Sequence, residues 1–261
     1  MILDEIIKRR KIQLEREMHE CSLSEIKKRA DMQLCDRMPL PLDEALKKDR
    51  LSCICEVKKA SPSRGLIRED FRPVEIAKEY EAAGADAISC LTEEHFFHGS
   101  SKFLADIRKE VKIPILRKDF IFDEYQIYEA AAIGADAVLL IMSVLGLRHY
   151  VSLYKLAENL GLSVLVEVHN TEEIKKAAVA EPKIIGVNNR DLTTFEVDLY
   201  TVQKLKPFIS NDAVFVSESG IKTNSDMKMV HSLGADAVLI GETLMRSDNI
   251  TDELHKLREG V

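Results

Sequence analysis

The sequence lacks the features that would place it in a membrane or on nucleic acid. No apolar run approaches the ~20 residues needed to span a bilayer, and charge begins at Asp4 without the apolar core of a signal peptide. Lysine and arginine together number 37 against 44 aspartates and glutamates, and no basic block interrupts this balance. We therefore expect a cytoplasmic protein that binds neither membrane nor nucleic acid.

Cysteine and histidine patterns typical of metal or redox sites are also missing. The five cysteines include no Cys-x-x-Cys, and Cys53 and Cys55 alternate along an apolar run, so we expect them in the core. The seven histidines form neither His-x-His nor His-Glu-x-x-His. One cluster has the right residue types for a metal but is expected to be a solvated loop: Glu93, Glu94, His95 and His98. The sequence predicts no metal and no cofactor.

What the sequence has instead is a repeated phrase, Gly-Ala-Asp-Ala, that begins at Gly84, Gly134 and Gly234. Repetition at a fixed period, here 50 and then 100 residues, indicates copies of one structural unit. A helical stretch precedes each phrase and an apolar run follows it, which predicts a helix, a glycine C-cap and a buried strand. Fifty residues suit two such units.

The strands that this period requires are present between the visible copies. Further apolar runs cover residues 51–57, 113–118, 163–168, 183–188 and 213–217, which brings the total to eight. Eight strand–helix units over about 200 residues predict a (β/α)8 barrel. An open doubly wound sheet is the alternative, but it usually has a Gly-x-Gly-x-x-Gly turn after its first strand, and the sequence has none.

The first 50 residues lie outside this barrel count. Apolar residues at helical spacing among charged ones predict an amphipathic helix: Ile2, Leu3, Ile6, Ile7, Leu14 and Met18. A second helix is expected after Ser22, with Ser22 or Ser24 as its cap. We expect one domain, with a helical extension at residues 1–50 and the barrel at 51–261.

Active sites of such barrels lie at the carboxyl ends of the strands, and polar residues end every predicted strand. These are Glu56, Lys58, Thr92, Lys118, Ser143, Glu167, His169, Asn188, Arg190, the segment 218–220 and Gly241. Residues two apart on a strand face the same side. We expect Thr92, Ser143 and His169 to be ordinary strand-end residues. The converging lysines and glutamates indicate a site, because ionised groups cost free energy there unless they are paired or used.

Two loops carry a more specific pattern. Gly220 follows the seventh strand and Gly241 the eighth, where barrels commonly bind phosphate through backbone N–H groups. Residues 58–65 form a basic loop with proline and glycine, which is interpreted as a lid, with a mobile surface loop as the alternative. A small phosphorylated substrate is implied.

These residues together resemble indole-3-glycerol phosphate synthase, and the similarity spans the whole chain. It is carried by Glu56-Val57-Lys58-Lys59-Ala60-Ser61-Pro62-Ser63, Leu91-Thr92-Glu93, Phe97-His98-Gly99-Ser100 and Arg117-Lys118-Asp119-Phe120. It continues in Glu167-Val168, Gly186-Val187-Asn188-Asn189-Arg190-Asp191-Leu192, Ser217-Glu218-Ser219-Gly220-Ile221 and Ile240-Gly241-Glu242.

The resemblance implies ring closure of 1-(2-carboxyphenylamino)-1-deoxyribulose 5-phosphate to indole-3-glycerol phosphate, with loss of carbon dioxide and water, in tryptophan biosynthesis. Lys118 would be the general acid, with a pKa lowered by burial or by Lys58 and Arg190. Glu167 would be the general base. The implied catalytic set is completed by Glu56, Lys58, Asn188 and Ser219.

The resemblance also implies binding residues. For the substrate body these are Ser61, Phe97, Phe120, Leu139, Arg190, Leu192 and Glu218, with phenylalanines replacing the absent tryptophan for aromatic contact. For the phosphate they are Lys58, Gly220, Ile240, Gly241 and Glu242. The carboxylate of Glu242 would repel a phosphate, so we expect that side chain to turn outward.

Three alternatives stay open at this point. A phosphosugar-barrel isomerase shares the two loop glycines, and a Schiff-base aldolase would use Lys118 or Lys58 as a nucleophile. A barrel that serves only as a binding scaffold is the third. The net charge of −7 suits either a monomer or a weak dimer.

Overall fold

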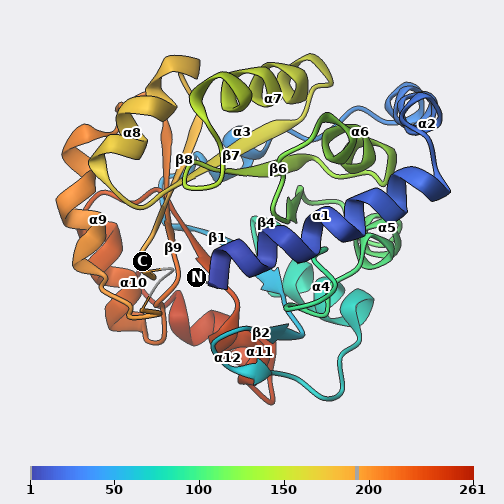
Figure 1. Ribbon diagram of the computed structural model, residues 1–261. Helices are drawn as coiled ribbons and strands as arrows, with labels where there is room; N and C mark the ends of the chain where they lie inside the picture. The colour runs from blue at the N-terminus through green and yellow to red at the C-terminus, as the bar shows by residue number, and fades with distance from the viewer. Residues whose placement is uncertain (1, 192–193) are drawn as a thin grey trace.

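Eight parallel strands close into a barrel in this computed structural model, which describes residues 2–191 and 194–261 (Figure 1). Around the barrel the order is β1, β10, β9, β8, β7, β6, β5 and β4. The strands are β1 Ser52–Val57, β4 Ala87–Leu91, β5 Ile115–Lys118, β6 Ala137–Ile141, β7 Ser163–Val168, β8 Ile184–Asn188, β9 Val214–Glu218 and β10 Ala237–Ile240. The barrel predicted from the 50-residue period is confirmed, and the open doubly wound sheet is wrong.

Helices follow the strands and cover the outside of the barrel. They are α4 Pro73–Ala82, α5 Ser101–Arg108, α6 Glu124–Ala132, α7 Leu147–Asn159, α8 Thr171–Ala177, α9 Tyr200–Leu205, α10 Asn224–Ser232 and α12 Ile250–Leu257. Short additions are the 3-10 turns η1 Ala178–Ala180 and η2 Lys206–Phe208 and the helix α11 Glu242–Arg246. The first loop contains a small hairpin, β2 Ala60–Ser61 with β3 Gly65–Leu66.

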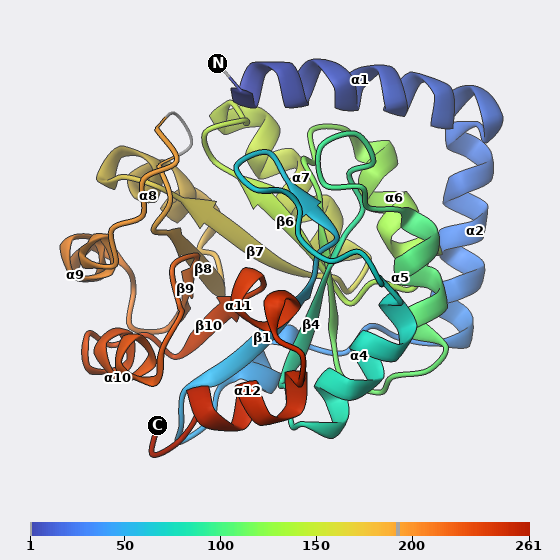
Figure 2. The same cartoon turned by 90° about the horizontal axis from the view of Figure 1, so that it is seen from below.

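The N-terminal extension consists of α1 Ile2–Glu20, α2 Leu23–Asp36 and α3 Leu42–Leu46. Figure 2 shows α1 running across one end of the barrel and α2 descending beside α6. Ser22, and not Ser24, caps α2, because its hydroxyl accepts the N–H of Glu25. At the other end of the barrel, Leu42 and Leu46 of α3 pack into the interior. In the part of the chain that is described, no helix is long and apolar enough to cross a membrane.

The repeated phrase is a structural clamp between neighbouring strands. Its glycines end α4, α6 and α10 with φ of 85°, 83° and 89°, which favours glycine. Its aspartates Asp86, Asp136 and Asp236 each accept a backbone N–H at the start of the adjacent strand, at 2.8, 2.8 and 2.7 Å. The interpretation of these residues as scaffold at the amino end of the barrel is confirmed.

Alternation along β1 separates the two sides of the barrel wall. Ile54 packs in the barrel interior, whereas Cys53 and Cys55 face the covering helices, all three fully buried. The two cysteines are core residues, as predicted. The next inward residue on this strand is Glu56, so the same alternation that fills the core brings a carboxylate to the carboxyl end.

Candidate active site

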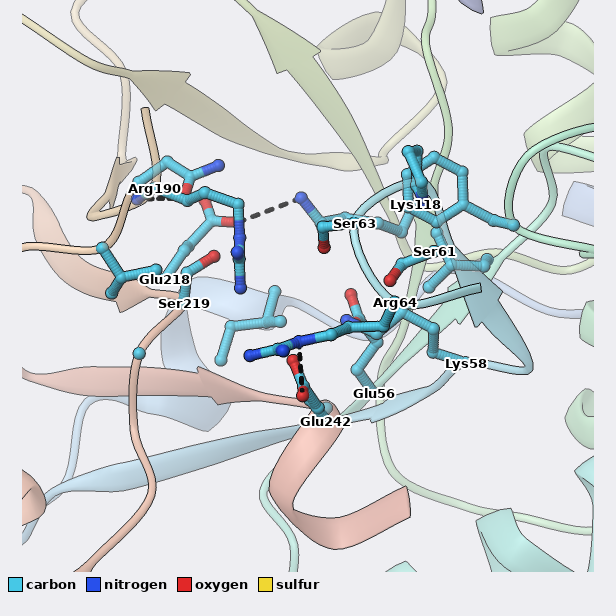
Figure 3. A pocket seen from close by; sticks show the side chains of 18 of the residues that line it. Glu56, Lys58, Ser61, Ser63, Arg64, Lys118, Arg190, Glu218, Ser219 and Glu242 are labelled. Atoms are coloured by element: carbon cyan, nitrogen blue, oxygen red, sulfur yellow. Dashed lines mark hydrogen bonds and ion pairs between the residues drawn. The ribbon is translucent and has the colours of Figure 1, made fainter. Parts of the chain in front are cut away.

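A cavity of about 670 Å³ opens at the carboxyl ends of the strands, beneath the first turns of α1. It is lined by every predicted site residue that the structure describes, together with Ile2, Leu3 and Ile6 of α1. The predicted residues are Glu56, Lys58, Ser61, Phe97, Lys118, Phe120, Leu139, Glu167, Asn188, Arg190, Glu218, Ser219, Gly220, Ile240, Gly241 and Glu242. Leu192 lies outside the described residues. Figure 3 shows how ten of the lining side chains lie.

Lys118 ends β5 between two carboxylates. Its Nζ donates to Glu167 Oε2 at 2.9 Å and to Glu218 Oε2 at 3.0 Å. Burial by itself would lower the pKa of Lys118, but the charges of Glu167, Glu218 and Glu56 outweigh it and raise the pKa above its ordinary value. The predicted lowering of this pKa is therefore wrong, because the nearest groups are anions and not Lys58 or Arg190.

Glu167 ends β7 with a different partner on each oxygen. Oε2 accepts from Lys118, and Oε1 accepts from Asn188 Nδ2 at 3.1 Å and lies 3.3 Å from His169 Nε2. Burial opposes ionisation, yet Lys118 and His169 together lower the pKa of Glu167. This side chain is therefore an oriented carboxylate at neutral pH.

Glu218 ends β9, and its pKa is shifted in the opposite direction from that of Glu167. Burial and the charge of Glu167 work against Lys118 and raise the pKa of Glu218 to about 7. Its Oε1 is buried and has no hydrogen-bond partner among the described residues. One of the two carboxylates that share Lys118 is thus ready to carry a proton near neutral pH.

Glu56 and Lys58 form an ion pair at the end of β1, with Nζ 2.5 Å from Oε1. The prediction that these residues face the same side is confirmed. Asn188 and Arg190 both line the cavity, and the Arg190 N–H also donates to Asn188 Oδ1 at 3.0 Å. The lysines and glutamates that end the strands therefore meet in one cavity: Lys58, Lys118, Glu56, Glu167 and Glu218.

A buried charge network lies directly behind Lys118. Arg10 of α1 donates to Asp119 through Nε at 3.0 Å, and Arg117 contacts Asp119 at 3.1 Å and Glu129 at 2.6 Å. Thr92 donates to Asp119 at 2.8 Å and is fully buried, so its interpretation as an ordinary strand-end residue is wrong. Ser143, by contrast, is exposed as expected.

The loops after β9 and β10 form one wall of the cavity. Ser219 and Gly220 both have positive φ, 67° and 93°, and Asn189 Nδ2 holds this turn by donating to the Ser219 carbonyl at 3.1 Å. Glu242 does not turn outward as predicted. Its carboxylate lies at the rim of the cavity, 3.0 Å from Arg64 Nε and 3.2 Å from Arg246 Nε. Figure 3 shows Arg64 and Glu242 pointing toward one another.

The opposite wall is apolar. Phe97 and Phe120 lie with ring centroids 6.0 Å apart and an interplanar angle of 40°. Leu139 of β6 belongs both to the barrel core and to the cavity lining. This wall offers space for an aromatic ring beside the charged groups.

The loop after β4 was predicted to be solvated, and this is wrong for Glu93. Glu93 is fully buried, and its carboxylate accepts the N–H groups of His95, Phe96 and Phe97 at 2.8 to 3.0 Å. Glu93 thereby fixes the turn that presents Phe97 to the cavity. Among residues 2–191 and 194–261, no group of three or more histidine, cysteine, aspartate or glutamate side chains is placed to hold a metal.

The family model for "Indole-3-glycerol phosphate synthase" matches residues 3–257, which is nearly the whole chain. The chain belongs to this family. An indole-3-glycerol phosphate synthase of Ruminiclostridium cellulolyticum is 52% identical over 258 residues, with 99% of both chains covered. One of Alkaliphilus metalliredigens is 48% identical over 262 residues, with 100% of this chain and 99% of the relative covered.

The barrel also resembles solved structures of other proteins. A thiamine phosphate pyrophosphorylase from Pyrococcus furiosus superposes with a TM-score of 0.61 at 18% identity, covering 84% of this chain and 96% of that one. At this identity the likeness concerns the fold alone.

Three residues that the sequence did not mark as candidate site residues support this cavity. Asp119, directly after Lys118, is paired with Arg10, and Asn189, directly after Asn188, donates to the Ser219 carbonyl. His169, expected to be an ordinary strand-end residue, lies beside Glu167. The signal available was position alone, because each lies within two residues of a predicted site residue.

Proposed function

We propose that the protein closes the indole ring of indole-3-glycerol phosphate, by decarboxylation and dehydration of 1-(2-carboxyphenylamino)-1-deoxyribulose 5-phosphate, in tryptophan biosynthesis. The observation that carries this proposal is the position of Lys118. It lies between Glu167 and Glu218 and beside the apolar wall of Phe97 and Phe120 in a chain of this family. A proton donor, two proton acceptors and a surface for an aromatic ring thus meet in one cavity.

In the first step, Lys118 is the general acid. The ring carbon that carries the carboxylate attacks the ribulose carbonyl, and the carbonyl oxygen takes a proton from the ammonium of Lys118. Carbon dioxide then leaves, and its bonding electrons restore the aromatic ring. The raised pKa of Lys118 keeps the ammonium charged before substrate arrives, and negative charge on the reacting oxygen supplies the driving force for transfer.

In the second step, Glu167 is the general base. Loss of the new hydroxyl as water requires a proton donor at that oxygen and an acceptor for a proton on the adjacent carbon. Glu167 is ionised and oriented by Asn188, which suits it to accept this proton. Lys58, paired with Glu56, assists departure of the hydroxyl.

Substrate binding divides between the two walls. The phosphate is proposed to bind by the loops at Gly220, Ile240 and Gly241, with Lys58 supplying charge. The aromatic ring is proposed to lie against Phe97, Phe120 and Leu139, with Leu192 as a further contact. Ser61, Arg190, Glu218 and Glu242 complete the proposed binding set, and Asn188 and Ser219 orient the hydroxyl groups.

The geometry disfavours a Schiff-base reaction. A nucleophilic lysine must be neutral, which requires a lowered pKa. The carboxylates around Lys118 raise its pKa instead, so this residue is better suited to proton donation.

The test follows indole fluorescence while the carboxyphenylamino-deoxyribulose phosphate is consumed. Lys118→Ala should still bind the substrate, but its turnover number should be at least about 100-fold lower than that of the wild type. The control Lys102→Ala, at an exposed lysine of α5, should match the wild type. No indole product from the wild type would overturn the activity, and wild-type turnover in Lys118→Ala would overturn the role of this lysine.

We also propose a cytoplasmic protein that is a monomer or weak dimer and does not bind nucleic acid, with a single domain made of the barrel and its N-terminal extension. The net charge of −7 supports the lack of nucleic-acid binding. Sedimentation analysis over a range of concentrations tests the oligomeric state.

A further inference from the structure

His169 lies next to the proposed general base and is held there by a second carboxylate. Its ring Nε2 is 3.3 Å from Glu167 Oε1, and its ring Nδ1 is 3.2 Å from Glu173 Oε2. The backbone N–H of His169 donates to the same Glu173 oxygen at 2.8 Å. The Nε2 contact is an ion pair without hydrogen-bond alignment, so its contribution is electrostatic.

Glu173 is itself fixed by the start of α8. Asn170 caps this helix by accepting the Glu173 N–H at 2.9 Å, and Asn170 Nδ2 donates to Glu173 Oε1 at 2.8 Å. Glu173 is therefore anchored at its backbone and at both side-chain oxygens. It presents a rigid acceptor to the imidazole ring.

The two contacts favour a charged ring, because each ring nitrogen lies within 3.3 Å of a carboxylate oxygen. A neutral imidazole carries one N–H and one lone pair, so it would place a lone pair beside one of the two carboxylates. An imidazolium presents an N–H on both sides. Consistent with this geometry, burial would lower the pKa of His169, but Glu167 and Glu173 outweigh burial and raise it to about 10.

The charge matters most after Lys118 has given up its proton. Glu167 then keeps Asn188, which is neutral, and loses its lysine counter-charge while the carboxyl of Glu218 stays close. The charged groups around this centre are Glu167 of β7, Glu173 of α8, Lys118 of β5 and Glu218 of β9. Of these and His169, only His169 would remain a cation.

We propose that His169 is a positioning residue, whose imidazolium, held by Glu173, keeps Glu167 oriented and ionised through the dehydration step. This inference rests on the proposed function, because it assigns Glu167 to the base. It corrects the interpretation of His169 as an ordinary strand-end residue. It also gives Glu173, which lies behind the cavity, a role through the ring of His169.

Two variants separate charge from structure. His169→Asn removes the cation, so kcat should fall about tenfold with KM little changed, and the acid limb of the kcat profile should move to higher pH. Glu173→Gln keeps an oxygen for the His169 N–H but removes one counter-charge. The ring pKa should then fall, and kcat should decline as pH rises from 7 to 9, where the wild type stays level.

The control is His149→Asn on the exposed face of α7, which should leave kcat and its pH profile unchanged. Ring NMR of the wild type, assigned by the signal lost in His169→Asn, should show an imidazolium up to pH 8. In case His169→Asn does not fold, Glu173→Gln assigns the same signal by its shift.

A neutral His169 ring at pH 7 in the wild type would overturn the inference, as would a Glu173→Gln profile that overlays the wild type. The proposed function is tested separately by indole formation in the wild type and its loss in Glu167→Gln. If these two results hold while the histidine results fail, only the role of His169 is wrong.

Discussion

At the scale of single residues, two glycines make room for the carboxylates of the cavity. A Cβ placed on Gly186 would collide with Glu218 Oε1, and one placed on Gly241 would collide with Glu56 Oε1. Gly186 lies within β8 and Gly241 directly follows β10, so each carboxylate closely approaches the backbone of a neighbouring strand or loop. Gly241 therefore has a structural reason to be glycine in addition to its proposed place near the phosphate.

The raised pKa of Glu218 predicts a specific pH dependence of stability. An ordinary glutamate in the unfolded chain titrates near ~4.3, whereas Glu218 in the folded protein titrates at about 7. The folded state binds this proton more tightly, so the contribution of Glu218 to stability falls as pH rises through that window and levels off above it.

Glu218→Gln removes this titration. The stability of the variant relative to the wild type should therefore rise between about pH 4.5 and pH 7, by on the order of 2 kcal/mol. Urea denaturation at several pH values checks it. A stability difference that stays constant over this range would contradict the assigned pKa.

The sequence predicted the positions of those site residues that lie at strand ends, because the 50-residue repeat indicates where the strands end. Lys118, Glu167 and Asn188 end strands whose register follows from the repeated phrase, so their convergence could be foreseen. The pKa of Lys118 could not, because it depends on how three strands aim their carboxylates. His169 was missed for the same reason, since Glu173 reaches it from the following helix.

At the scale of elements, an ion pair between Arg10 of α1 and Asp119, the residue after Lys118, connects the N-terminal helix to the barrel. Arg10 is fully buried, and its guanidinium contacts Asp119 and Glu17. Without Arg10, Arg117 would be the cation left beside Asp119 and Glu129 in this buried network, and removing one member of a buried charge network typically costs about 3–5 kcal/mol. The residue after Lys118 would also lose its restraint.

Arg10→Met should therefore destabilise the protein by about 3–5 kcal/mol and lower kcat. The matched control is its neighbour Arg9→Met, because Arg9 pairs with Glu5 on the exposed face of α1 and should change either quantity little. Denaturant unfolding and steady-state kinetics measure the two effects. Equal losses in both variants would argue against a specific role for the Arg10 contact.

The hairpin of the first loop is held to the start of α11, which follows the neighbouring strand β10, by the ion pair of Arg64 and Glu242. Glu242→Gln weakens this contact, so trypsin should cleave the Arg64–Gly65 bond several-fold faster. The control Glu20→Gln alters an exposed contact on α1 and should not change the rate at that bond. Mass spectrometry of a digestion time course identifies the site, and an unchanged rate would show that the ion pair does not restrain the hairpin.

The sequence predicted elements as far as periodicity reaches. All eight barrel strands and the first two helices carry a repeated apolar pattern, and they were found. The strands β2 and β3 of the hairpin have two residues each and helix α3 has five. These elements are too short to show a periodic apolar pattern. The path of α1 across the mouth depends on Arg10 and Asp119, which lie 109 residues apart and have no local signal.

At the scale of the whole molecule, the two ends of the barrel have different tasks. The carboxyl end holds the cavity, and the amino end holds the aspartates of the repeated phrase. Asp86 accepts the Cys53 N–H and is paired with Arg50 and Lys48. Burial would raise the pKa of Asp86, but the hydrogen bonds from Arg50, Lys48 and Cys53 outweigh it and lower the pKa.

Asp86→Asn should lower stability without changing the chemistry. Since the folded pKa lies below the ordinary value of ~3.9, the charge of Asp86 stabilises the fold above that pH, and this contribution is lost as pH falls through the folded pKa. The variant should be less stable than wild type by about 1–3 kcal/mol at pH 7, and the difference should shrink below about pH 4. Its kcat should be unchanged, because the strand ends that carry Lys118 and Glu167 lie at the other end of the barrel.

The control is Asp31→Asn, at an exposed residue of α2, which should match the wild type in both stability and kcat. A loss of kcat in Asp86→Asn at a temperature where this variant is fully folded would show that the two ends of the barrel are coupled.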